Sequence, residues 1–547
     1  MIVTYENKKI EIKKETTVKE ILKEEIEKSK YTVVGCIYNN EYKNLETRIE
    51  EDTKIQLLDI STKEGMKIYI RTLVYIMGKV FEKRYPKEKI VVEYQLGNAM
   101  FCKCENIEIT EEFIEDIKLR MQEIIDKDFK IKTVEMKRKE AEKFLEENKS
   151  VKGKLQLDLE DNQKIYMSIC DNYFNYCYSG VIADRTGIIS KFNVVKYADG
   201  FLLRYPSSKE PTKMSQFKET KKLAWALDEF EKIHEVLDVN TVYKLNKAIE
   251  ENRINDIIML AEALHEKKIA NIADEIAQRK NVKMILIAGP SSSGKTTFAQ
   301  RLGIQLRLNG LKPVTISVDN YFVERQDTPR DANGEYDFEN IEAIDLDLFN
   351  NHLIKLLNGK EIEMPEFDFV VGTKKYNGKK LKLADDEILV IEGIHCLNDR
   401  LTSQISKDQK YKIYISALTV LNMDRYSRIS TTDTRLVRRI VRDNQFRGYS
   451  ALHTLNTWHK VTNGEEKNIF PFQEEADTIY NTSLIYELAA LKNFAEPLLK
   501  EIGKEYKEHA EAQRLLNMLK YFKPIPSEYV PNNSLLKEFL GGGNFKY

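Results

Sequence analysis

Residues 283–300 read KMILIAGPSSSGKTTFAQ, and this stretch decides the fold that we expect for the C-terminal half of the chain. Its apolar start, residues 284–288, predicts a buried strand, and the apolar spacing over residues 296–308 predicts a helix. Between them lies the pattern G-x-x-x-x-G-K-[ST], whose glycines allow the backbone a tight turn. This order predicts a phosphate-binding loop, and a Gly/Ser turn with an incidental lysine is the alternative.

Such a loop would hold a triphosphate through its main chain. Its N–H groups turn inward, and the N-terminus of the next helix adds partial positive charge. Lys295 is expected to reach the β- and γ-phosphates, and the hydroxyl of Thr296 is expected to bind Mg²⁺. The residues expected to contact the nucleotide are Gly289, Pro290, Ser291, Ser292, Ser293, Gly294, Lys295, Thr296 and Thr297.

Two acidic residues come at the ends of later strands in the same half. Residues 313–318 predict a strand that leads into Asp319, and residues 387–393, EILVIEG, predict one that ends in Glu392. Right-handed crossovers place the carboxyl ends of parallel strands at one edge of a sheet. We expect Asp319 to accept the proton of an attacking hydroxyl near the γ-phosphate. We expect Glu392 to bind Mg²⁺ directly or through water, with a capping or salt-bridge role as the alternative.

An arginine-rich helix is predicted at residues 433–443, DTRLVRRIVRD. Arg435, Arg438, Arg439 and Arg442 recur at i, i+3, i+4 and i+7, which is one helical face. Because four guanidinium groups on one face repel each other without anions opposite, the pattern predicts a lid that closes on transferring phosphates. A solvated helix paired with neighbouring acids is the alternative.

Length and composition set the frame for these motifs. A chain of 547 residues is long for one core, and three or four domains are expected. Lys+Arg 86 against Asp+Glu 87 leaves a formal charge of −1, so bulk charge does not predict a polyanion binder. Six cysteines form no dense disulfide framework. The start, MIVTYENKKI, has no apolar signal segment, and no apolar run approaches a membrane span, which together predict a soluble cytoplasmic protein.

The first 60 residues show the pattern of a small strand-rich domain. An amphipathic helix is expected at residues 17–28. Strands are expected at residues 2–5, 10–13, 32–38 and 54–60. This ββαβ…β order resembles the TGS domain, a ubiquitin-like β-grasp domain found at the front of threonyl-tRNA synthetases and some GTPases.

The next 150 residues extend that resemblance. The segments EGMKIYIRTLVYIMGKVFEKRYP, EEFIEDIKLRMQEIIDKDFKIKTVEMKRKEAEKF and TGIISKFNVVKYADGFLLRYP are similar in order and spacing to the second additional domain of the synthetase, which edits mischarged tRNA. In that family an H-x-x-x-H pair and a later Cys and His form the working site. The corresponding positions here are Arg71, Tyr75, Tyr178 and Ile182.

No histidine precedes His234, so we expect no zinc- or histidine-based editing site. Two interpretations of residues 61–210 stay open. The region either keeps a surface that faces tRNA or another RNA, or it is a scaffold that only packs against the next domain.

Three smaller features are predicted to be structural or are left open. Cys102 and Cys104 share one strand face and are expected to be half-buried rather than metal ligands. Residues 211–280 predict a helical connector, in which His265 is expected to be a surface or packing histidine. Residues 506–547 predict a helix and then a tail that is either mobile or docked through Leu535, Leu536 and Phe539.

The motifs GPSSSGKTT, SVDNYF, YDFENIEAID, MPEFDF, VIEGIH and DTRLVRRIVRD occur in the order and spacing of the uridine kinase and phosphoribulokinase group of P-loop kinases. The region that resembles this group spans residues 281–500. The resemblance implies a phosphotransferase with an alcohol group as acceptor, which uses ATP and Mg²⁺.

Carried over to this sequence, the resemblance assigns roles to individual residues. It implies that Asp319 is the base, that Arg438 and Arg442 face ATP, and that Glu339 holds ribose hydroxyls beside Arg439. The implied catalytic residues are Asp319, Lys295, Arg438 and Arg442. The implied substrate-binding residues are Asp319, Tyr321, Glu339, Phe367 and Arg439, and the implied metal ligands are Thr296 and Glu392.

The positions that read the base depart from the family pattern. Uridine kinases tend to carry Tyr, His, Arg and Gln where this chain has Phe367, Gly372, Tyr449 and Thr457. Each lost hydrogen bond is worth up to roughly tenfold in preference, so several together could change the substrate. The motifs support phosphoryl transfer and do not specify uracil.

The sequence thus predicts a multidomain α/β protein whose last large domain is a P-loop kinase with a parallel sheet flanked by helices. The expected parts are a β-grasp TGS-like domain at 1–60, an α+β synthetase-like domain at 61–210, the connector at 211–280, the kinase domain at 281–505 and the C-terminal helix and tail at 506–547. The predicted function is an ATP-dependent nucleoside kinase. The alternatives are a nucleotide-gated protein that binds tRNA or another RNA through residues 1–210, and a P-loop kinase of a non-nucleoside sugar. A homo-oligomer is left open.

Overall fold

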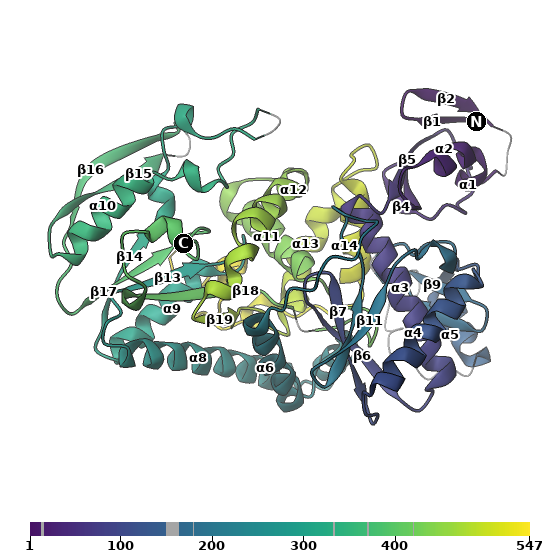
Figure 1. Cartoon of the computed structure of the whole chain (residues 1–547), viewed down its shortest axis with the longest axis horizontal. Coiled ribbons are helices and arrows are strands. Elements are labelled where there is room, and N and C mark those ends of the chain that lie inside the picture. The colour runs from purple at the N-terminus through teal and green to yellow at the C-terminus, as the bar shows by residue number, and fades with distance from the viewer. Residues whose placement is uncertain are drawn as a thin grey trace.

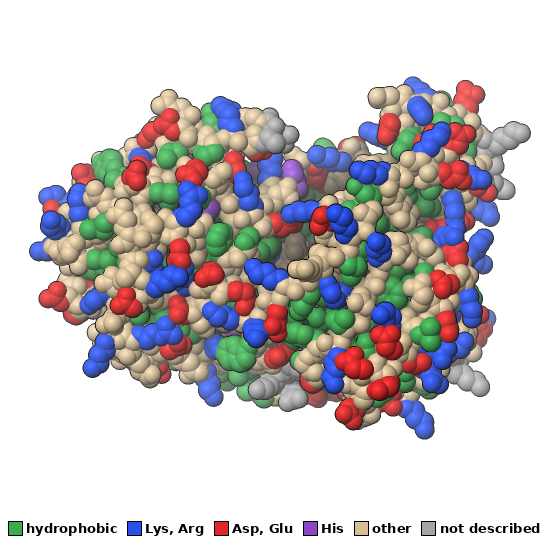
Figure 2. Space-filling view, viewed as in Figure 1, with side chains coloured by type: hydrophobic (Ala, Val, Ile, Leu, Met, Phe, Trp, Pro, Cys, Tyr) green, Lys and Arg blue, Asp and Glu red, His purple; other side chains and the backbone are tan. Residues whose placement is uncertain are grey.

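The computed structural model describes residues 1–12, 16–148, 163–178, 180–331, 334–368, 371–419 and 421–546. The chain forms two halves, with the N-terminus in one and the C-terminal end among the elements of the other (Figure 1). Lys, Arg, Asp and Glu side chains are interspersed over the face seen in Figure 2, as the formal charge of −1 suggests. Among the described residues, no helix is long and apolar enough to cross a membrane.

The first unit is a five-stranded sheet with strand order β2-β1-β5-β3-β4. Strand β1 pairs with β5 in parallel, and its other neighbour β2 is antiparallel. The helix begins at the Thr17 N-cap, whose hydroxyl accepts from the N–H of Glu20, and it breaks at Leu22 into α1 and α2. The elements are β1 (Ile2–Tyr5), β2 (Lys8–Glu11), α1 (Val18–Ile21), α2 (Lys23–Lys28), β3 (Val33–Tyr38), β4 (Glu41–Lys43) and β5 (Thr53–Asp59).

The second unit packs the long helix α3 (Lys63–Arg84) against a four-stranded sheet of order β11-β12-β7-β6. Phe81 of the helix stacks on Phe201 of the sheet at 6.4 Å between ring centroids. A separate three-stranded sheet has the order β10-β9-β8. The further elements are β6 (Lys89–Gln95), β7 (Ala99–Glu105), α4 (Glu111–Asp126), β8 (Lys132–Lys137), α5 (Arg138–Glu147), β9 (Lys164–Cys170), β10 (Tyr173–Tyr176), β11 (Asn193–Tyr197) and β12 (Gly200–Arg204).

Three helices follow, as the periodic stretch predicted: α6 (Lys221–Leu237), α7 (Val242–Glu250) and α8 (Ile254–Gln278). Their role as a connector stays a prediction. His265 on α8 is buried, and its Nε2 lies 3.1 Å from the carbonyl of Ser483. Burial lowers the pKa of this imidazole to about 3, so it packs as a neutral group. One apolar core continues from Met167 of the N-terminal half to Leu536 near the C-terminus.

The C-terminal half is built on a parallel sheet of order β14-β17-β13-β18-β19. Strand β13 lies at its centre, and its five residues are all buried because helices cover both faces (Figure 1). The strands of this sheet are β13 (Met284–Ala288), β14 (Lys312–Ser317), β17 (Glu387–Glu392), β18 (Lys410–Ser416) and β19 (Thr478–Asn481). The other long elements are α9 (Lys295–Leu308), α10 (Leu346–Leu357), β15 (Ile362–Asp368), β16 (Thr373–Leu381), α11 (Thr431–Arg447), α12 (Ala451–Asn468), α13 (Glu487–Lys500) and α14 (His509–Leu519).

The C-terminal tail, which the sequence left as either mobile or docked, is docked. After α14 it returns to the parallel sheet and ends in the short helix α15 (Lys537–Leu540). Leu535, Leu536 and Phe539 are all 0% exposed. These are the three side chains named as the means of docking.

Candidate active site

The phosphate-binding loop joins the end of β13 to the start of α9, as its flanking patterns predicted. A Cβ at Gly289 would come within 2.2 Å of the carbonyl oxygen of Ile415, so only glycine lets β18 approach there. Gly294 has a φ of +87°, which is left-handed backbone that favours glycine. The two glycines of the motif are therefore both required by local geometry.

Lys295 folds back over this loop. Its Nζ donates to the carbonyl oxygen of Gly289 at 2.9 Å and to that of Pro290 at 3.3 Å. The side chain is half-buried at the first turn of α9, next to Thr296. Its ammonium group thus lies beside the loop where the phosphates of a nucleotide are expected.

Asp319 and Glu392 lie at the same edge of the sheet. Ser317, two residues before Asp319, is paired in register with Glu392, which is itself paired with Ile287 of the central strand. Both carboxylates therefore come near the loop that follows β13, as the crossover rule predicted. Asp319 is exposed to solvent and Glu392 is half-buried.

The protein around this edge shifts the pKa of both acids upward. The protein atoms packed around Asp319 displace part of its water and raise the pKa of its carboxyl group above the ordinary value, although the side chain keeps an exposed face; the charges of Lys295 and Arg447 oppose the rise. Burial raises the pKa of Glu392 to about 7, with Lys295 and a hydrogen bond from Thr296 acting in the other direction. A carboxyl group of this kind takes up a proton or a cation readily at neutral pH.

Glu339 is the third acid near the loop. Its side chain lies against Gly464 of α12, where a Cβ would come within 2.7 Å of it. Burial raises its pKa to about 7, and Glu465 adds to the rise while Lys295 and Arg439 oppose it. Among the residues that the structure describes, Asp319, Glu339 and Glu392 take part in no ion pair.

Helix α11 carries two buried arginines, which differ from the solvated helix that was the alternative, and its role as a lid over the phosphates stays a prediction. Arg435 is 1% exposed and forms two hydrogen bonds with the carboxylate of Glu465, at 2.5 and 2.7 Å. Arg438 is 0% exposed and donates to Glu487 at 2.5 Å. These two cations are neutralised by acids far away in sequence, so they hold α11 against the loop. The expected contact of Arg438 with ATP stays a prediction.

The same helix also touches the loop directly. Arg435 and Arg438 donate to the carbonyl oxygens of Ser291 and Ser292, at 3.2 and 3.4 Å. Arg439 donates to the hydroxyl of Ser291 at 2.7 Å. Because these bonds fix the outer part of the loop, α11 sets the position of its backbone.

Arg442 lies further along α11 and donates to the buried carboxylate of Asp443 at 2.8 and 3.1 Å. Arg439 approaches the same carboxylate to 3.1 Å and Arg447 to 3.6 Å. One acid therefore faces three guanidinium groups, which leaves an excess of positive charge at this end of the helix. Such an excess suits contact with a phosphate, and that role stays a prediction for Arg442.

Two of the expected substrate residues lie behind the site. Tyr321 is 0% exposed, and its hydroxyl lies 3.1 Å from Nδ1 of His352 in the core. Phe367 is 5% exposed and packs on Phe322 at 5.5 Å between ring centroids. In this conformation both rings support the segment that carries Asp319, and their contact with substrate stays a prediction.

Sequence reasoning missed two acids that touch the loop. Glu465 accepts from the N–H of Ser291 at 2.9 Å while it holds Arg435. Glu538 of the tail accepts from the N–H of Thr297 at 3.2 Å and from its hydroxyl at 2.7 Å. Neither residue belongs to a recognisable motif, and both come from far along the chain.

The residues present fit a nucleotide and Mg²⁺. The start of α9 already binds a carboxylate through the N–H of Thr297, which shows that the hydrogen-bond donors of this turn can hold an anion. The hydroxyl of Thr296 and the carboxylate of Glu392 are hard oxygen ligands of the kind Mg²⁺ prefers, and they lie within hydrogen-bonding reach of each other.

The positions that resemble the editing site of the synthetase are engaged with backbone groups. Nε of Arg71 donates to the carbonyl oxygen of Val181 at 3.0 Å. The hydroxyl of Tyr75 lies 3.1 Å from the carbonyl oxygens of both Ser168 and Tyr173. Tyr178 and Ile182 are each 4% exposed. The four side chains serve packing in this conformation.

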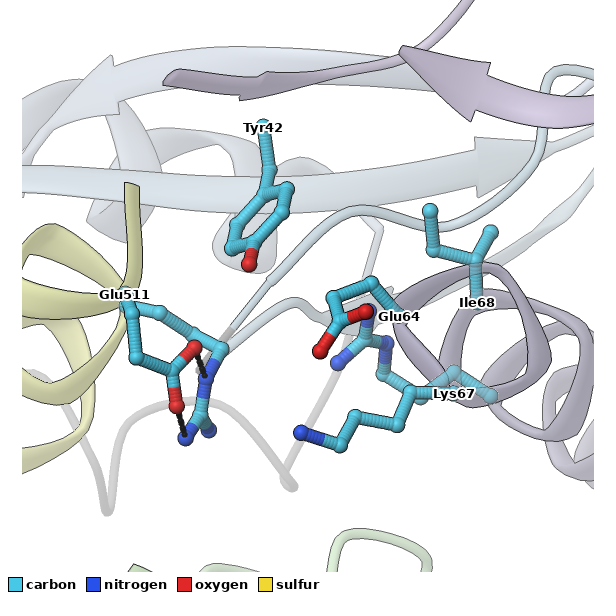
Figure 3. Close-up of a pocket in the computed structure, with 7 residues that line it drawn as sticks. Tyr42, Glu64, Lys67, Ile68 and Glu511 are labelled. Carbon is cyan, nitrogen blue, oxygen red and sulfur yellow. Dashed lines mark hydrogen bonds and ion pairs between the residues drawn. The ribbon is translucent and has the colours of Figure 1, made fainter. Parts of the chain in front are cut away.

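A small cavity lies beside Arg71, between β4, α3 and α14 (Figure 3). Glu64 and Lys67 of α3 point toward Tyr42 and Glu511. Glu511 accepts from the guanidinium of Arg514 at 2.6 and 2.8 Å. Burial alone would raise the pKa of Glu511, but the positive charges of Arg514 and Lys67 outweigh it and hold the pKa at about 2. Opposite charges thus meet in this cavity.

A parallel sheet with a phosphate-binding loop after its central strand, and acids at the ends of two neighbouring strands, is the arrangement of a P-loop nucleotide-binding domain. Residues 284–484 match the model of the phosphoribulokinase / uridine kinase family. This chain belongs to that family, and it is a phosphotransferase with an alcohol group as acceptor.

Curated relatives share this region. A uridine kinase of Deinococcus deserti is 30% identical over 165 residues, which are 30% of this chain and 70% of the relative. A uridine kinase of Mycoplasma genitalium is 29% identical over 178 residues, or 32% of this chain and 74% of the relative. A uridine kinase of Borrelia duttonii is 29% identical over 230 residues, or 41% of this chain and 98% of the relative.

Proposed function

We propose that this chain is an ATP-dependent nucleoside kinase, which transfers the γ-phosphoryl group of ATP to the 5′-hydroxyl of a nucleoside. The observation that carries the proposal is the placement of Lys295, Asp319 and Glu392 around the start of α9. Relatives that are named uridine kinases support the choice of a nucleoside as acceptor.

Each of these side chains has a chemical role in the proposal. Asp319 is open to solvent and free of an ion pair among the described residues, so it accepts the proton of the attacking hydroxyl. Lys295 balances charge on the transferred group. Thr296 and Glu392 would hold Mg²⁺, which supplies further charge neutralisation at the phosphates when bound.

Glu339 and Arg439 are proposed to bind the nucleoside. Glu339 is half-buried, lies near Arg439, and forms no ion pair among the described residues. A carboxylate of this kind accepts hydrogen bonds from ribose hydroxyls, whereas a group already paired would not. The departures at Gly372, Tyr449 and Thr457 leave the identity of the base to experiment.

The N-terminal half is proposed to be a scaffold that supports the kinase half. Its first unit, residues 1–60, is proposed to be TGS-like, and residues 61–210 a synthetase-like unit without editing chemistry. Backbone contacts support this role: the N–H of Val92 on β6 donates to the carbonyl oxygen of Arg425 at 2.8 Å, and Asn422 donates to that of Val92 at 3.0 Å.

The test is a substrate panel with purified protein, ATP and Mg²⁺. Nucleosides, pentoses and pentose phosphates are incubated separately, with and without bulk tRNA, and products are identified by mass spectrometry. We expect a nucleoside 5′-monophosphate and ADP in equal amounts, and none from the Lys295→Ala variant. A phosphorylated free pentose would replace the nucleoside with another sugar. Absence of any phosphorylated product, together with salt-sensitive tRNA binding, would contradict the proposal and favour an RNA-linked switch.

A further inference from the structure

The C-terminal tail ends on the phosphate-binding loop, although more than 200 residues separate them in sequence. Glu538 lies on α15, and its carboxylate accepts from both the N–H and the hydroxyl of Thr297. The contact is direct, at 3.2 Å from the N–H and 2.7 Å from the hydroxyl, and it is buried, because Glu538 is 8% exposed and Thr297 is 0% exposed. The tail therefore supplies a buried anion to the N-terminal turn of α9.

A second contact covers the loop next to this anion. The side chain of Leu535 lies against Gly294, where a Cβ would come within 2.5 Å of Cδ2 of that leucine. Ser293 and Leu535 are both 0% exposed. Lys295 and Thr296, in contrast, stay half-buried. The tail thus covers one side of the loop and leaves the side that faces Asp319 and Glu392 more open.

The tail is held there by α11 as well. The ring of Phe539 lies under the guanidinium of Arg438, 5.0 Å from its carbon. The side-chain amide of Gln300 on α9 donates to the carbonyl oxygen of Lys546 at 2.9 Å. Contacts on both sides of Glu538 therefore fix α15 over the start of α9.

These donors are the ones that a nucleotide needs. The backbone N–H groups of a phosphate-binding loop and of the first turn of its helix hold the phosphates. A carboxylate and a phosphate oxygen cannot occupy the N–H and the hydroxyl of Thr297 at once. The aliphatic side chain of Leu535 also excludes a ligand from the surface of Gly294.

We propose that the C-terminal tail is an autoinhibitory segment, which occupies part of the nucleotide site with the Glu538 carboxylate in place of a phosphate. ATP binds when residues 535–540 lift from the loop, and the docked tail and the bound nucleotide exclude each other. This inference rests on the proposed kinase function, because it concerns the same loop.

The test compares ATP binding by full-length variants. Mg²⁺·ATP is titrated by calorimetry into the wild type, Glu538→Ala, Glu538→Gln and Glu528→Gln. Glu528 is an exposed acid of the same tail, so its variant controls for the loss of one charge. Thermal unfolding shows that each variant is folded. Because glutamine keeps the shape of the acid, Glu538→Gln remains informative if the alanine variant fails to fold.

We expect ATP to bind Glu538→Ala about ten- to hundredfold more tightly than the wild type, the range that hydrogen bonds to a charged group are worth. Glu538→Gln should gain a smaller factor, and Glu528→Gln none. In the wild type, ATP should speed hydrogen exchange of residues 535–540. Equal ATP affinity in all variants, or slower exchange in the tail with ATP, would overturn the proposal. Tight ATP binding by Glu538→Ala without any phosphorylated nucleoside would support the autoinhibitory role of the tail and would overturn the proposed kinase function instead.

Discussion

Two clusters of charged side chains in this molecule differ in how their carboxyl groups are paired. In the cavity between β4, α3 and α14, Glu511 is paired with Arg514, which also donates to Asp433 at 2.6 and 2.9 Å. At the carboxyl edge of the parallel sheet, Glu339 and Glu392 have no such partner among the described residues. The pKa of Glu511 is held at about 2, whereas those of the other two rise to about 7.

The difference separates charges that hold the structure from charges available for chemistry. A carboxylate with a buried cationic partner is fixed in its ionised form, so it neither takes up a proton nor binds a metal ion. A carboxyl group whose pKa lies near neutrality does both. Burial of a charge is therefore a weak indicator of function, and the lack of a partner is the stronger one. Arg435 and Arg438 show that paired charges also occur beside the loop itself.

The largest expected effect breaks a buried pair. Arg438→Ala leaves Glu487 buried without its cation, so we expect a loss of about 3–5 kcal/mol in the free energy of unfolding. Arg447→Ala is the matched control on the same helix, because that side chain is 51% exposed and its removal should cost less than about 1 kcal/mol. Denaturant unfolding measures both. Equal, small losses would mean that α11 is free to move as a lid.

The second effect is a pH dependence of opposite sign at the two places. The pKa of Glu392 is raised by folding, so the folded protein holds a proton that the unfolded chain releases. Its contribution therefore favours folding below its ordinary pKa of 4.5, and is lost as pH rises to about 7. The pKa of Glu511 is lowered, so its contribution is present above 4.5 and is lost as pH falls toward about 2.

Denaturant unfolding at pH 5 and pH 8 separates the two. Glu392→Gln should shrink the loss of stability between pH 5 and pH 8, by up to about 3 kcal/mol at roughly 1.4 kcal/mol per pKa unit. Glu511→Gln should destabilise by the same amount at both pH values. If Glu392→Gln left the pH dependence of unfolding unchanged, folding would not raise the pKa of Glu392, and this prediction would be wrong.

The smallest effect concerns the positions that resemble an editing site. Tyr75→Phe removes one hydroxyl that lies near two carbonyl oxygens, so we expect a loss of about 1 kcal/mol in the free energy of unfolding and no change in kcat. Tyr529→Phe, an exposed tyrosine, should change neither. A fall in kcat with unchanged stability would show that the N-terminal half takes part in the reaction.

The local parts of the fold could be predicted from the sequence. Strand β13 has the predicted bounds, and helix α9 begins one residue before the predicted start. The short strand β4 was missed because its three residues, EYK, carry no apolar alternation. The predicted strand at residues 10–13 lies in part outside the described residues, and β2 covers Lys8–Glu11.

The site could be predicted only as far as sheet topology carries it. Asp319 and Glu392 lie at the carboxyl ends of parallel strands, so the sequence predicted that both lie at the same edge of the sheet. The partners of Arg435 and Arg438 were not, because Glu465 and Glu487 come 30 and 49 residues later, without a pattern that links them. The docking of the tail was undecided for the same reason: Leu535 packs on a glycine more than 200 residues away.

The most direct test of the central claim is the turnover of Asp319→Asn with Mg²⁺·ATP and the accepted nucleoside. We expect kcat to fall about 10²- to 10⁴-fold, while ATP affinity and the free energy of unfolding stay unchanged, because the exposed carboxylate acts only on the proton of the acceptor. Asp408→Asn, at the opposite end of the sheet before β18, is the matched control and should keep full activity. Undiminished turnover by Asp319→Asn would contradict the account.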